Sequence, residues 1–60
     1  MMKVKDLEIN TTLVNINVLR GVFIDTYCLK KEDCISKFGN YSVVSNVKTR
    51  NATYLTIKED

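Results

Sequence analysis

The side chains able to do chemistry in this sequence are few, and its two cysteines are the most reactive of them. Cys28 and Cys34 are separated by five residues, and the sequence contains no histidine. Structural zinc sites use Cys and His ligands, usually with a CxxC pair, so this spacing does not predict a metal site. Without histidine there is also no Ser-His or Cys-His pair for nucleophilic catalysis. We therefore expect no metal, no cofactor and no catalytic residue.

The same cysteines bear on redox state and location. A disulfide between Cys28 and Cys34 is one alternative, but small secreted domains usually carry more than two cysteines. Residues 1–20 are rich in charged and amide side chains and hold no apolar run long enough for a signal peptide or a membrane span. The sequence therefore predicts two reduced, mostly buried thiols in a cytoplasmic protein. Its richness in Asn, Lys and Ile is typical of AT-rich genomes, which makes a bacterial host the expected setting.

Two other kinds of catalytic site are not predicted either. Gly21 and Gly39 are the only glycines, so there is no glycine-rich loop to hold a phosphate. A pair of catalytic carboxylates needs a cleft, and a chain of 60 residues has little interior from which to form one. We expect one small domain over residues 1–60 that is not an enzyme.

Alternating apolar residues predict the first two strands. In residues 12–19, Val14, Ile16 and Val18 share one parity, which is the period of a strand with one buried face. Residues 22–29 alternate again, although both parities there contain apolar side chains. Because Arg20-Gly21 links the two runs, we expect a β-hairpin, with one long strand bent at a bulge as the alternative.

In residues 30–39 the spacing of apolar residues changes from that of a strand to that of a helix, because Cys34, Ile35 and Phe38 are spaced as on one helix face. Glu32 and Asp33 lie in the first turn of this helix and Lys37 in its last turn, as the helix dipole favours. Gly39 is expected to end this helix in the left-handed conformation. Ile35 and Phe38 are expected to be its buried anchors.

Two further strands are predicted at residues 41–50 and 53–58, with Asn51-Ala52 as the turn between them. The expected fold is α+β, with a four-stranded, mainly antiparallel sheet and one short helix in the order β-β-α-β-β. Residues 1–11 fit an edge strand, a first helical turn or an arm.

One helix covers only one face of such a sheet, so the other face is a candidate interaction surface. The alternation places on it Leu13, Leu19, Phe23, Tyr27, Leu29, Val44 and Tyr54. Aromatic residues are enriched in interfaces, so Phe23, Tyr27, Val44 and Tyr54 are the expected contacts with a second copy of the chain or with a partner protein. A shifted strand register, or residues 1–11 folded over this face, would remove the surface.

Nucleic acid is the alternative partner. The net charge is +2 and the isoelectric point is 8.6, which is weak for a nucleic-acid-binding protein. The best basic pairs are Lys3 with Lys5 and Lys48 with Arg50. An exposed tyrosine beside them would stack on bases, as aromatic residues do on RNA-binding sheets.

The segment from Arg20 to Lys58 carries four short patterns: Lys31-Glu32-Asp33-Cys34-Ile35, Ser36-Lys37-Phe38-Gly39, Tyr41-Ser42-Val43-Val44-Ser45 and Tyr54-Leu55-Thr56-Ile57. In these it resembles very small, uncharacterised proteins encoded by bacteriophages and mobile elements of Gram-positive bacteria. The resemblance implies a ββαββ fold, a phage or prophage origin and a binding role. Some phage products of similar size block host defence systems by binding a host protein. The hypothesis that follows is a homo-oligomeric inhibitor that covers a surface of a host protein, and the resemblance transfers no catalytic residue.

Overall fold

Two hairpins joined by a short helix make up the fold. The computed structural model describes residues 2–59. The elements are η1 (Val4–Asp6, a 3-10 turn), β1 (Leu13–Arg20), β2 (Phe23–Lys30), α1 (Lys31–Phe38), β3 (Ser42–Lys48) and β4 (Thr53–Lys58). The predicted α+β class and β-β-α-β-β order are confirmed.

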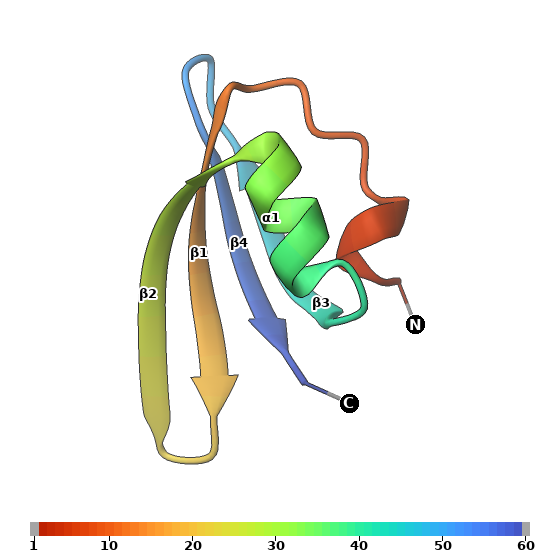
Figure 1. Cartoon of the computed structure of the whole chain (residues 1–60). Helices are drawn as coiled ribbons and strands as arrows, with labels where there is room; N and C mark the ends of the chain where they lie inside the picture. Colours follow the sequence, from red (N-terminus) through yellow and green to blue (C-terminus); the bar gives the residue numbers. More distant parts are fainter. Residues whose placement is uncertain (1, 60) are drawn as a thin grey trace.

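The four strands form one sheet in the spatial order β2-β1-β4-β3 (Figure 1). Each hairpin is antiparallel, whereas β1 and β4 lie side by side and parallel in the centre. The sheet is therefore mixed and mostly antiparallel. α1 and η1 lie on the same face of it (Figure 1).

The core lies between this face and the helix. Its sheet side is formed by alternate residues of the two central strands, and each of these is at most 1% exposed: Val14, Ile16, Val18, Leu55 and Ile57. Removing these branched side chains from water supplies the main driving force for folding.

Cys34 and Phe38 close the core from the helix. They are one helical turn apart, so both point at the sheet. The Phe38 ring lies 5.2 Å from the Tyr27 ring and 5.1 Å from the Tyr41 ring, between centroids. Ile35, expected as the second anchor, is only partly buried, because it lies beside the face defined by Cys34 and Phe38.

Gly21 has the role expected of it, whereas Gly39 does not. Gly39 is right-handed, with φ −55°, so the predicted left-handed cap is wrong. It is needed for close approach, because a Cβ there would collide with the carbonyl oxygen of Ile35 and lie 3.6 Å from Cβ of Lys5. Gly21 has the positive φ, 63°, as the first residue of the two-residue loop between β1 and β2. A type II′ turn requires this, and such turns match the twist of a hairpin.

Residues 2–9 combine edge pairing with a helical turn. The Val4 N–H donates to the Tyr41 carbonyl at 3.0 Å, and the Val43 N–H donates to the Met2 carbonyl at 2.9 Å. Val4 is fully buried and Ile9 is 1% exposed, both in the core. The segment therefore lies on the helix side and leaves the opposite face of the sheet uncovered.

The face of β2 that packs on the core is the opposite of the one expected. Tyr27 is paired with Ile16, so Phe23, Tyr27 and Leu29 all lie on the helix side of the sheet. The loop after Arg20 has two residues, which sets Phe23 directly opposite Arg20. A shift of one residue exchanges the two faces of a strand, and the sequence of β2 is apolar on both.

A bulge in β3 changes the faces of its residues as well. The register shifts between Val43 and Ser45, so Val43 opposes the buried Ile57 whereas Val47 opposes Tyr54. Val43 and Val47 are an even number of residues apart, which in a regular strand puts both side chains on one face. Here they lie on opposite faces, because the bulge inserts one unpaired residue between them.

Candidate functional site

The candidate site is the sheet face that α1 and η1 do not cover, which we call the open face. The strand registers place on it Leu13, Asn15, Asn17, Leu19, Ile24, Thr26, Cys28, Lys30, Ser45, Val47, Tyr54, Thr56 and Lys58. Val44, in the bulge next to the inward-facing Val43, adds a further side chain.

Large apolar side chains are unusually exposed on this face. The exposed fractions are 46% for Leu13 and Tyr54, 52% for Val44, 57% for Val47 and 62% for Ile24. Single exposed apolar residues are ordinary, but five on one sheet face are typical of an interaction surface.

Polar side chains occupy the middle of the open face. One row across the four strands reads Cys28, Asn15, Tyr54, Val47, and the next reads Thr26, Asn17, Thr56, Ser45. The Thr26 hydroxyl donates to Oδ1 of Asn17 at 3.2 Å. These short amides and hydroxyls both donate and accept hydrogen bonds, so the face combines apolar contact with polar specificity.

The charged residues that the four strands place on this face are all basic. Lys30 and Lys58 lie on it, whereas Asp25, the only acidic residue in the four strands, is paired with Val18 on the helix side. The open face is therefore weakly basic although the whole chain is nearly balanced.

The structure brings together only two of the four predicted interface residues. Val44 and Tyr54 lie on the open face, whereas Phe23 and Tyr27 lie on the helix side. Phe23 is 72% exposed near the hairpin loop, but Tyr27 packs against Phe38. Sequence reasoning missed Ile24, and the short loop after Arg20 was the signal that would have placed it.

The predicted basic residues do not form one patch. Lys3 lies beside Ser42 at one end of β3 and Lys5 follows it in η1, whereas Lys48 ends β3 and Arg50 lies in the loop beyond. A strand of this length separates the two pairs by about 20 Å. Lys48 is also held by its neighbours, since its Nζ donates to the Glu8 carbonyl at 3.0 Å.

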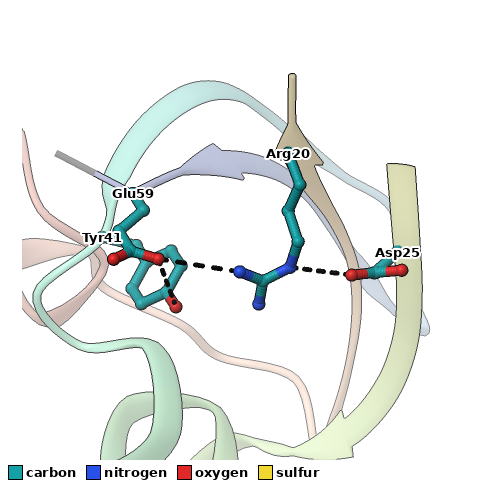
Figure 2. Close-up of polar contacts among 4 residues, drawn as sticks. All are labelled: Arg20, Asp25, Tyr41 and Glu59. Carbon is teal, nitrogen blue, oxygen red and sulfur yellow. Dashed lines mark hydrogen bonds and ion pairs between the residues drawn. The ribbon is translucent and has the colours of Figure 1, made fainter. Parts of the chain in front are cut away.

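A small polar cluster around Arg20 lies on the helix side (Figure 2). Arg20 Nε is 2.7 Å from Asp25 Oδ2, and its Nη1 is 3.6 Å from Glu59 Oε2. Tyr41 donates its hydroxyl to the same Glu59 oxygen at 3.3 Å. The Tyr41 hydroxyl is the largest influence on the pKa of Arg20, which is raised, with Asp25 adding to the effect. The cluster holds an always-charged guanidinium among exposed partners, which suits a structural contact rather than acid-base chemistry.

Two shallow hollows lie on the helix side. One, of about 380 Å³, is lined by residues 9–12 with Lys31 and Glu32. The other, of about 440 Å³, lies between β2 and the exposed side of α1 and is lined by Leu29, Asp33, Ser36 and Lys37.

The two thiols lie on opposite sides of the sheet. Cys34 is buried in the core and Cys28 is exposed on the open face, and neither forms a disulfide. Burial raises the pKa of the Cys34 thiol, which suppresses its reactive thiolate. Within residues 2–59, no group of three or more Cys, Asp or Glu residues is placed to hold a metal ion.

This arrangement predicts unequal thiol reactivity. We expect a thiol-reactive chromophore to modify Cys28 in the native protein and to reach Cys34 only after denaturation, because access and thiolate character both control the reaction. Stopped-flow absorbance measures the two phases. In the Cys28→Ser variant, the fast phase should disappear and the denaturant-dependent phase should remain. Two fast phases in the native protein would contradict the burial of Cys34.

No helix in residues 2–59 is long and apolar enough to span a membrane. Comparisons of this chain with protein-family models, with curated proteins and with solved structures found no match.

Proposed function

We propose that the chain is a protein-binding module that presents its open face to a partner protein. The observation that carries the proposal is the set of half-exposed apolar side chains on this face, among them Ile24, Val47 and Tyr54, that no described residue covers. Burying such side chains against a partner releases free energy that the isolated chain does not use.

A binding role fits this face better than a catalytic one. Among the open-face residues, Cys28 is the only strong nucleophile, and the sequence has no histidine to activate it. Both hollows lie on the helix side, away from this thiol. The resemblance to small phage proteins supports a host protein as the partner and surface occlusion as the mode of action.

Site-specific photocrosslinking tests this proposal. A photoreactive phenylalanine analogue at position 54 or 47 should form adducts with a distinct protein in lysate from Gram-positive bacteria, the host class that the resemblance implies. The same analogue at the exposed Ser36 of α1 is the matched control and should form none. Adducts at position 36 that equal those at position 54 would place the binding surface on the helix side and contradict the proposal.

One observation favours single-stranded nucleic acid as a second candidate. The described residues of the open face include no carboxylate and combine Lys58 with Tyr54, so they would not repel a phosphate backbone. Affinity for a labelled 12-nucleotide strand separates the candidates, because phosphate contacts weaken steeply between about 50 and about 200 mM salt whereas an apolar interface does not. Salt-sensitive binding that is lost in Tyr54→Ala would favour nucleic acid.

A further inference from the structure

The two edges of the sheet are protected to different degrees. At the β3 edge, hydrogen bonds from Val4 and Val43 join the N-terminal segment to the strand, and a bulge interrupts it. At the β2 edge, no strand within residues 2–59 pairs with the outer side. β2 is eight residues long, and the sequence contains no proline to block pairing. Such an edge is a template for another strand.

The hydrogen-bond ladder identifies which backbone groups of β2 face outward. The Lys31 N–H donates to the Thr12 carbonyl at 3.1 Å, which continues the β1–β2 register. Because hydrogen-bonded and non-hydrogen-bonded pairs alternate in an antiparallel ladder, Ile24, Thr26 and Cys28 direct their N–H and C=O groups away from β1. These three residues therefore offer a regular set of donors and acceptors.

We propose that β2 pairs antiparallel with β2 of a second copy, with Thr26 on the two-fold axis. Hydrogen-bonded pairing needs the outward-facing residues of both strands opposite each other. Two registers achieve this with the fullest overlap, one centred on Thr26 and one centred on Tyr27. The first places Ile24 opposite Cys28 of the second copy, whereas the second places Ile24 opposite a lysine. Matched apolar pairs stabilise a sheet, so the Thr26-centred register is favoured.

The same register would also bury the exposed ring of Phe23. It sets Phe23 opposite Leu29 of the second copy, on the helix side. Leu29 lines the hollow of about 440 Å³ beside α1. The Phe23 side chain is 72% exposed in the single chain, and this hollow would shield it from water twice, once in each copy.

Charge complementarity supports the same arrangement. The register sets Asp25 opposite Tyr27 of the second copy, and Lys37 lies over the Tyr27 ring, with Nζ 5.5 Å from its centroid. The Asp25 carboxylate would thus approach a lysine of the other copy, again twice. The contact uses the β2 edge and not the open face, so it goes beyond the proposed function, and either proposal can fail alone.

Crosslinking at the axis tests the register. In a Thr26→Cys, Cys28→Ser variant, the two Cα atoms at position 26 would lie about 5.5 Å apart, within the range of a disulfide. Mild oxidation should convert this variant to a dimer of twice the 6.9 kDa chain mass. The unmodified chain, which carries Cys28, should crosslink far more slowly. Efficient crosslinking through Cys28, or none in either protein, would overturn the proposal.

Sedimentation equilibrium tests the contact without crosslinking. Phe23→Lys should weaken self-association about tenfold or more, since it places a charge against Leu29. The fold should survive because Phe23 is 72% exposed, and a circular dichroism spectrum checks this. Val47→Lys, an equally drastic change on the open face, is the matched control and should leave self-association unchanged while weakening partner binding. Two results would overturn the β2 interface: a chain that is monomeric at every concentration, or self-association that only Val47→Lys weakens.

Discussion

Phe38→Ala should leave the protein largely unfolded at room temperature. Phe38 is 2% exposed and its ring contacts those of Tyr27 and Tyr41. The change therefore creates a cavity between α1, β2 and the residues that precede β3. Phe→Ala in a core costs about 3–5 kcal/mol of unfolding free energy. A domain of 60 residues has about 3–9 kcal/mol in total, so the loss approaches the whole stability.

Urea unfolding followed by circular dichroism measures the effect. Phe23→Ala, measured at a concentration where the chain is monomeric, is the matched control, because it removes the same ring from a site that is 72% exposed in the single chain. We expect it to shift the unfolding free energy by less than about 0.5 kcal/mol. A Phe38→Ala variant that melts within a degree or two of the parent would show that the helix does not pack through this ring.

Ile9→Ala should lower the stability of the fold almost as much as Phe38→Ala. Ile9 is 1% exposed and belongs to the core, although it lies outside any helix or strand. Isoleucine-to-alanine changes in cores cost about 2–5 kcal/mol, and here the loss would also loosen the segment that covers the β3 edge. The measurement is the midpoint of thermal unfolding.

Glu8→Ala is the control for this second prediction. The Glu8 side chain is exposed, and its contact with Lys48 uses the backbone carbonyl, which the substitution keeps. Equal effects of the two substitutions on the thermal midpoint would mean that residues 2–9 are not part of the core.

The parts of the fold that could be predicted are those with one clear period. In β1 the buried parity is Val14, Ile16 and Val18 and the other parity carries two asparagines, so only one face can be buried. In β2 both parities are apolar, and its face depends on the length of the loop after Arg20. Local pattern therefore identified the strand, but pairing with β1 decided which side of it faces the core.

The candidate site was predicted in part for the same reason. Val44 and Tyr54 lie on the open face as expected, and Tyr27 does not. The parallel pairing of β1 with β4 has no local signal, because it joins Val14 to Thr53 across most of the chain. Residues 2–9 also lack a period, and their burial depends on contacts with Tyr41 and Ser42, far away in sequence.

The central position of β4 has a consequence for synthesis on the ribosome. The first hairpin forms from neighbouring residues, within about 1–10 μs of its emergence. The β1–β4 pairing instead closes a loop of about 40 residues, at an entropic cost of roughly 3 kcal/mol. Until Thr53–Lys58 has left the exit tunnel, β1 and β3 each have one strand edge without its native partner, and the core lacks Leu55 and Ile57. We therefore expect the chain to acquire its structure in one late, cooperative step, and nascent chains halted before Thr53 to remain sensitive to proteases.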